Sequence, residues 1–135
     1  LLQDGAAAII VNSNGQILLQ SRADRDKWGL PGGCQELGER FQDTIIREIK
    51  EETNLDVREE DLELVEVVSG ASRRNSYPNG DVVINNTVLY CIKRYSGNLK
   101  WDSESKDMRF WDINNLPVNQ NDPDLIDIYI RKLKK

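Results

Sequence analysis

The sequence contains no histidine and only two cysteines among its 135 residues. The absence of histidine excludes Ser-His-Asp and Cys-His nucleophile pairs and every histidine-ligated zinc site. Cys34 and Cys91 lie far apart and form no C-x-x-C pair, so neither a disulfide framework nor a zinc site is indicated, and we interpret both as packing residues. Acid–base chemistry in this chain must therefore use carboxylates, lysine or tyrosine.

Long apolar runs and an excess of positive charge are also missing. No run approaches the roughly 20 residues that a membrane span requires, and no signal segment opens the chain, which predicts a cytoplasmic protein without a membrane partner. The net charge of −5 argues against binding of nucleic acid polymers but leaves free nucleotides open, because a metal can bridge two anions. The uniform composition predicts a single domain over residues 1–135, a size compatible with a homodimer.

The first half of the chain carries signals for strands followed by a helix. Residues 6–12 and 16–21 are predicted to form a hairpin across the turn at 13–15. The segment 28–39 has too many glycines for a helix and is expected to be a strand that breaks into a loop. Residues 40–53 follow a helical pattern that Asn54 ends.

The second half of the chain is likewise expected to form strands followed by a helix. Strands are expected at 62–72, 81–95 and 108–113, with the turn YPNGD before the second of them. Asp122 is expected to cap a final helix with Pro123 in its first turn. The order β, β, β, α, β, β, β, α favours an α/β (α+β) fold, an α/β/α sandwich around a mixed β-sheet.

The first predicted helix carries three glutamates that repel one another. Glu48, Glu51 and Glu52 are spaced so that neighbouring β-carbons lie about 5–6 Å apart, where like charges destabilise a helix. A helical wheel places them along the edge of the apolar stripe and Arg47 on the solvated side. A solvated acidic helix end is the simpler interpretation. Hard oxygen ligands clustered beside an apolar stripe instead favour Mg²⁺ or Mn²⁺ binding and phosphate chemistry.

The string GCQELGERFQDTIIREIKEETNL resembles the box of the Nudix hydrolase family, G-x5-E-x7-R-E-U-x-E-E-x-G-U with U apolar. The preceding WGLPGG and the order of elements also resemble this family. Asn54 is the one departure, because it stands where the family pattern has glycine. The positions that match are Gly33, Glu39, Arg47, Glu48, Ile49, Glu51, Glu52 and Leu55.

The resemblance implies Mg²⁺-dependent hydrolysis of a phosphoanhydride (pyrophosphate) bond in a nucleoside diphosphate derivative, by attack of water on phosphorus. Glu48, Glu51 and Glu52 would hold the metal, with Mn²⁺ as an alternative to Mg²⁺. Because histidine is absent, a glutamate must accept the proton. The candidates are Glu48 and Glu51 in the box and Glu104 in the later segment DSESKDM.

The remaining box positions have supporting roles by the same resemblance. Arg47 would orient a box glutamate through charge-assisted hydrogen bonds. Glu39 would brace the loop or touch the metal through water. Gly33 and Asn54 would be structural, with Asn54 closing the helix in a left-handed conformation that asparagine tolerates.

Contacts to the substrate are expected from two glycines, three cations and one tyrosine. The glycines would let the backbone approach metal or phosphate, although a tight turn also accounts for them. Cations beside a turn are usually solvated, and Pro, Asn and Gly alone suffice for a hairpin turn, so simpler interpretations compete here as well. The candidates are Gly32 and Gly33 for the backbone, Arg22, Arg25 and Lys27 for terminal phosphates, and Tyr77 for stacking on a base.

Two classes of function remain open. The first is an active hydrolase of small-molecule nucleotides, and the second is a Nudix-like nucleotide-binding or regulatory domain without turnover. The complete carboxylate set favours catalysis, because a site without turnover would be free to lose the destabilising Glu51 and Glu52. The box residues act on the diphosphate, so ADP-ribose, dinucleoside polyphosphates, oxidised deoxynucleotides and sugar nucleotides all remain as substrates.

Overall fold

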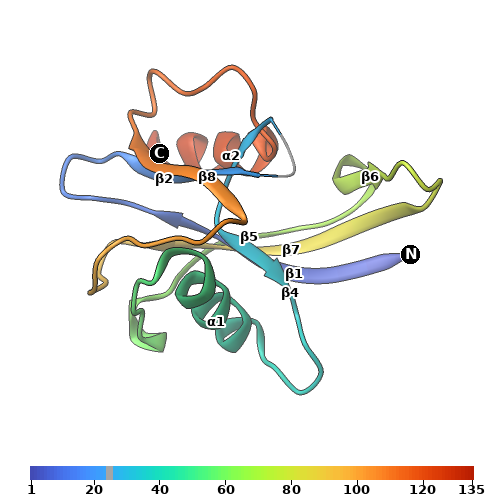
Figure 1. Ribbon diagram of the computed structural model, residues 1–135, viewed down its shortest axis with the longest axis horizontal. Helices are drawn as coiled ribbons and strands as arrows, with labels where there is room; N and C mark the ends of the chain where they lie inside the picture. Colours follow the sequence, from blue (N-terminus) through green and yellow to red (C-terminus); the bar gives the residue numbers. More distant parts are fainter. Residues whose placement is uncertain (24–25) are drawn as a thin grey trace.

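The computed structural model describes residues 1–23 and 26–135. Arg25, one of the candidate phosphate contacts, lies outside the described residues. Two helices lie on opposite sides of layered strands (Figure 1). The elements are β1 (Leu2–Ile10), β2 (Ile17–Arg22), β3 (Trp28–Gly29), β4 (Gly32–Cys34), α1 (Phe41–Thr53), β5 (Glu63–Val68), β6 (Arg74–Ser76), β7 (Val82–Ile92), β8 (Ser105–Trp111) and α2 (Pro123–Leu133).

The strands form two sheets. The larger sheet has five strands in the order β4-β1-β7-β5, with β6 paired to β7 beside them. It is mixed, because β1 runs parallel to β7 while β4, β5 and β6 pair antiparallel to their neighbours. The smaller sheet has the order β3-β2-β8 and is antiparallel.

Alternate residues of β1 face two hydrophobic cores. Ala6, Ala8 and Ile10 pack with Ile45 and Ile49 of α1 in one core. The intervening residues of the same strand pack with α2 in the other. Residues 6–10 of this strand form a continuous apolar run, as is typical of a central strand covered on both faces. The two helices thus enclose the sheets, which confirms the α/β/α sandwich and the mixed sheet expected from the sequence.

The predicted hairpin of residues 6–12 and 16–21 is wrong beyond its turn. The two segments are joined by the bridge Val11–Ile17 and by hydrogen bonds between Asn12 and Gln16, among them Asn12 N to Gln16 O at 3.0 Å. The strands then separate into different sheets, because β4 and β7 occupy both edges of β1 and β2 pairs with β3 and β8 instead. The spacing of turn and apolar residues in the sequence predicts the turn, but it does not show which strand pairs with each edge of β1.

The other predicted elements are present with shifted boundaries. The strand expected within 28–39 is divided into β3 and β4, and the strand expected over 62–72 ends at Val68, before a short 3-10 turn and β6. The turn YPNGD joins β6 to β7, as expected. The helix α2 begins at Pro123 with Asp122 at its N-cap position, as expected, but the Asp122 side chain makes no capping hydrogen bond. Its carboxylate instead accepts a hydrogen bond from Leu30 N at 3.2 Å. In the part of the chain described, neither helix has the length and apolarity to cross a membrane.

Asn54 ends α1 in the left-handed conformation that the box pattern predicts. Its φ is 67°, and its backbone N–H donates to the carbonyl of Lys50 at 3.1 Å. The side chain makes a contact that the sequence did not reveal, because Nδ2 donates to Asn98 O at 3.1 Å. Asparagine therefore combines a tolerated backbone conformation with a link between the helix end and the loop after β7.

Replacement of Asn54 by glycine is expected to change the free energy of unfolding by less than about 1 kcal/mol. Glycine relieves the left-handed strain, but the exposed hydrogen bond to Asn98 is lost, and the two effects are of similar size. Denaturant unfolding measures the difference. Asn54→Ala is the control, since it keeps the strain and loses the bond, and it should cost about 1–2 kcal/mol. Equal effects of the two substitutions would show that backbone strain is unimportant here.

Candidate functional site

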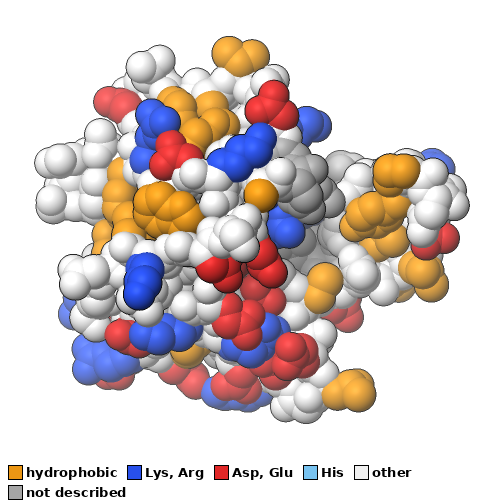
Figure 2. All heavy atoms as spheres, viewed as in Figure 1, with side chains coloured by type: hydrophobic (Ala, Val, Ile, Leu, Met, Phe, Trp, Pro, Cys, Tyr) orange, Lys and Arg blue, Asp and Glu red, His pale blue; other side chains and the backbone are white. Residues whose placement is uncertain are grey.

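An acidic pocket of about 480 Å³ lies where the C-terminal half of α1 meets β4 and the segment before β8. It brings Glu104 together with the three box glutamates, although these residues are distant in sequence. Acidic side chains gather beside α1 on the face seen in Figure 2. The pocket is lined by Gln20, Arg22, Gly32, Gly33, Glu48, Glu51, Glu52, Asp102, Glu104 and Ser105.

Glu52 is held by two neutral donors. Its Oε1 accepts from Gln20 Nε2 at 2.9 Å, and its Oε2 accepts from the backbone N–H of Gly32 at 2.9 Å. Burial, reinforced by the neighbouring Glu48 carboxylate, raises the pKa of Glu52 to about 7. A carboxylate in this position is costly to ionise, so a cation in the pocket would stabilise it.

Arg47 lies among the box carboxylates and not on the solvated side of the helix. Its side chain is only 22% exposed. Nε donates to Glu39 Oε2 at 2.7 Å, and Nη1 donates to Glu48 Oε1 at 3.0 Å and more weakly to Glu51 Oε2 at 3.3 Å. Nη2 donates to the carbonyl of Cys34 at 3.1 Å. The helical wheel misplaced this residue because it ignores how a long side chain bends back along the helix.

Glu39 ties the loop after β4 to the start of α1. It accepts hydrogen bonds from Glu36 N and from Thr44 Oγ1, each at 2.9 Å. The hydrogen bond from Arg47, with that from Glu36 N, lowers the pKa of Glu39 to about 2. A carboxylate that is ionised and engaged in this way fits the bracing role proposed for it.

The donor set of the pocket fits a hard divalent cation. Four glutamates and one aspartate supply oxygen ligands, and no histidine exists in the chain to supply nitrogen. No three acidic or thiol side chains of residues 1–23 and 26–135 are already gathered at metal-binding distances. Arg47 Nη1 contacts both Glu48 and Glu51, while Glu52 faces Gln20 and Gly32. Metal binding by Glu48, Glu51 and Glu52 stays a prediction.

Gly33 is needed for the present position of Glu48, whose flexible carboxylate occupies the space where a β-carbon would lie. Gly32 is required for a different reason. A β-carbon there would collide with the backbone of Ala6 and Ala7 in the neighbouring strand. The two glycines therefore let β4 approach the helix on one side and β1 on the other, which a tight turn alone does not demand.

Alanine at the two glycines is expected to have different effects. Gly33→Ala should displace the flexible Glu48 carboxylate and lower turnover about 10²-fold, with little change in melting temperature. Gly32→Ala meets rigid backbone and should cost about 2 kcal/mol of stability or more. Calorimetry and steady-state kinetics on both variants measure these effects. A Gly33→Ala protein with normal turnover would show that the position of Glu48 is unimportant.

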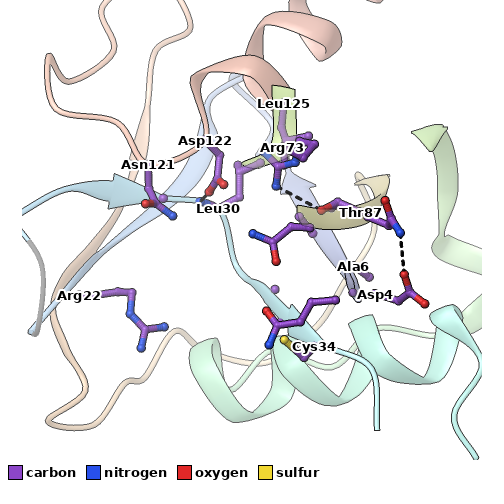
Figure 3. A pocket seen from close by; sticks show the side chains of 18 of the residues that line it. Asp4, Ala6, Arg22, Leu30, Cys34, Arg73, Thr87, Asn121, Asp122 and Leu125 are labelled. Atoms are coloured by element: carbon purple, nitrogen blue, oxygen red, sulfur yellow. Dashed lines mark hydrogen bonds between the residues drawn. The ribbon is translucent and has the colours of Figure 1, made fainter. Parts of the chain in front are cut away.

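A second cavity of about 400 Å³ adjoins the acidic pocket, and the two share Gln20, Arg22, Gly32 and Gly33. In Figure 3, Arg22 and Cys34 lie on the side toward α1, and Arg73 and Leu125 on the side toward α2. Lys27 and Tyr77 also line this cavity, so all five candidates for substrate contact that lie within the described residues border one space. Cys34 is exposed here, so its interpretation as a packing residue is wrong, whereas Cys91 is buried.

Several polar residues of this cavity were missed from the sequence. Arg73 is fixed by a 2.9 Å ion pair with Asp124 and a 3.2 Å hydrogen bond to Thr87 Oγ1. Asp122 lines the same wall, and burial raises the pKa of its carboxyl group. The available sequence signal was the pair Asp122 and Asp124 at the start of α2. The sequence analysis interprets Asp122 as a capping residue only.

Gln20 and Asp102 of the acidic pocket were missed as well. Gln20 is only 3% exposed, although it stands in a strand whose other buried residues are largely apolar. A polar residue at a buried strand position requires hydrogen-bonding partners, which was the available signal. Asp102 sits two residues before Glu104 in a polar segment, where nothing distinguishes it from a solvated loop residue.

The NUDIX domain family model matches residues 1–131. The chain belongs to the Nudix family. It is 34% identical over 111 residues to an ADP-ribose pyrophosphatase of Methanocaldococcus jannaschii, a match that covers 80% of this chain and 61% of that protein. The chain thus spans less than two thirds of the length of this relative.

Solved Nudix structures share the fold. A MutT NUDIX hydrolase from Burkholderia pseudomallei superposes with a TM-score of 0.77 at 24% identity, covering 96% of this chain and 97% of that one. The NUDIX domain of Shewanella oneidensis NrtR, complexed with ADP ribose, superposes with a TM-score of 0.74 at 21% identity, covering 98% of this chain and 89% of that one. At these identities the superpositions establish the fold.

Proposed function

We propose that this protein hydrolyses a pyrophosphate bond in a nucleoside diphosphate linked to a second group. The observation that carries the proposal is the shared edge of the two cavities. A substrate lying in the second cavity would extend its diphosphate across Gly32 and Gly33 into the acidic pocket. Glycine at both positions leaves the backbone open to phosphate oxygens, and Arg22 lines both spaces as a source of positive charge.

Different residues in and beside the acidic pocket would bind the metal, position a ligand and accept the proton. Glu48, Glu51 and Glu52 would hold Mg²⁺ or Mn²⁺, which neutralises a pyrophosphate and lowers the pKa of bound water. Arg47 holds Glu48 in place through its 3.0 Å hydrogen bond. Glu104, which lines the same pocket, would accept the proton of the attacking water. As the new P–O bond forms, the anhydride P–O bond breaks and two phosphate-bearing products result.

We propose ADP-ribose and related nucleotide sugars as the first substrates to test. The relative from M. jannaschii is named as an ADP-ribose pyrophosphatase and matches 80% of the chain, well beyond the box. The second cavity is rich in amide and carboxylate side chains, which can hydrogen-bond the hydroxyl groups of a sugar. Those side chains belong to Gln3, Asp4, Asn85, Asn86, Asn121 and Asp122.

A hydrolysis screen tests the proposal. The substrates are ADP-ribose, a nucleotide sugar, a dinucleoside polyphosphate and an oxidised deoxynucleoside triphosphate, each with Mg²⁺ and with Mn²⁺, and chromatography identifies the products. We expect cleavage between the two phosphorus atoms of ADP-ribose, giving AMP and ribose phosphate. Tight binding of these nucleotides in calorimetry with no product from any of them would favour a regulatory domain without turnover.

A further inference from the structure

Gln20 occupies a buried position between two parts of the acidic pocket that are distant in sequence. Its Nε2 donates to Glu52 Oε1 at 2.9 Å, and its Oε1 accepts from Ser105 Oγ at 3.3 Å. A carboxamide is suited to this position, because one end donates to a carboxylate while the other accepts from a hydroxyl. The bond to Glu52 adds no positive charge, so it orients the carboxylate without neutralising it.

A β-bulge brings Ser105 to this position. The pairing of β2 with β8 matches Ser21 with Asp107 but Arg22 with Ser105, so Lys106 is the extra residue. Bulges redirect side chains and are frequent beside active sites. Without this shift in register, Lys106 would lie opposite Arg22, and Ser105 would lie one position farther along the strand.

The segment ahead of Ser105 is held by hydrogen bonds of the Glu104 backbone. Glu104 N donates to Asp102 Oδ1 at 2.9 Å, and Glu104 O accepts from Ala23 N at 2.8 Å. Glu104 itself is exposed at the pocket. The hydroxyl of Ser105, the residue after Glu104, thus connects this segment to Gln20, and Gln20 connects it to Glu52.

We infer that Gln20 and Ser105 form a positioning bridge that holds Glu52 of α1 and the Glu104 segment in one arrangement for catalysis and cation binding. This role rests on the proposed hydrolytic function for its kinetic consequence. Its geometric consequence, the orientation of Glu52 toward a cation, can be measured without any substrate. Groups that orient a ligand through a hydrogen bond typically change metal affinity or activity 10–100-fold when lost.

Gln20→Met tests the bridge, because methionine has a similar shape and forms neither hydrogen bond. We expect Mn²⁺ affinity of the free protein, measured by electron paramagnetic resonance, to fall about tenfold and kcat about 10–100-fold. Gln120→Met is the matched control. Gln120 also donates one hydrogen bond, to Pro117 O at 3.1 Å, but lies outside the acidic pocket, and both quantities should stay within about twofold of wild type. Unchanged Mn²⁺ affinity and kcat in Gln20→Met would overturn the inference.

Ser105 gives a second test that does not alter the buried core. Ser105→Ala should lower kcat severalfold, and Ser105→Thr, which keeps the hydroxyl, should restore it. In a double-mutant cycle, Glu104→Gln should cost less in the Gln20→Met background than in wild type. If the two substitutions lower kcat by independent factors that simply multiply, the coupling between Gln20 and Glu104 is overturned. If the wild type hydrolyses no nucleotide while Gln20→Met still weakens Mn²⁺ binding, the proposed function fails and the bridge stands.

Discussion

Glu52→Gln is expected to lower kcat about 10³-fold while the protein stays folded. A metal ion bound by a carboxylate contributes several kcal/mol to stabilising the charge that develops in the transition state, and each 1.36 kcal/mol corresponds to about a tenfold change in rate. Glutamine keeps the shape of the side chain but removes its charge. Steady-state kinetics with saturating Mg²⁺, together with Mn²⁺ titration, measure the effect.

The stability of the Glu52→Gln protein should remain close to that of wild type. The substitution removes a partly buried charge whose pKa burial has raised to about 7, and it relieves repulsion from Glu48. Against this, the new amide group faces a donor, either Gln20 Nε2 or Gly32 N, and one hydrogen bond is lost. Glu63→Gln, an exposed substitution on β5, serves as the control for loss of one negative charge. Full activity in Glu52→Gln would contradict its assignment as a metal ligand.

Glu104→Gln is expected to lower kcat about 10²–10⁴-fold, the usual effect of losing a general base. The box glutamates are poor bases if they bind metal, because a bound cation lowers the pKa of a carboxylate. Glu48 is in addition held by Arg47 at 3.0 Å. Glu104 lines the same pocket from a different element and has an exposed side chain, which suits a group that must exchange protons with water.

Mn²⁺ affinity separates the roles open to Glu104. Unchanged affinity with a large loss of kcat supports the general base, whereas a fall in both assigns Glu104 as a ligand. A loss of kcat of less than about threefold would show that a box glutamate accepts the proton, with Glu51 as the next candidate. Glu60→Gln provides the control, because Glu60 is 69% exposed and lies outside the pocket.

The fold class, the positions of both helices and the residues of the box could be predicted from the sequence alone. These follow from local rules, since apolar spacing defines the helix faces and Asn54 adopts the left-handed conformation that ends α1. The repulsion among Glu48, Glu51 and Glu52 was likewise evident from spacing alone, because residues three and four positions apart on a helix are neighbours whatever the rest of the chain does.

Which distant residues share the pocket depends on how the strands pair in three dimensions. Gln20, Ser105 and Glu104 meet the box glutamates because β2 leaves β1, pairs with β8 and carries a bulge at that point. Strand pairing depends on which sheet edges are free, and no local pattern in the sequence records that. The inward position of Arg47 was decided in the same way, because its hydrogen-bonding partners Glu39 and Cys34 O come from a loop and a strand that fold over the helix.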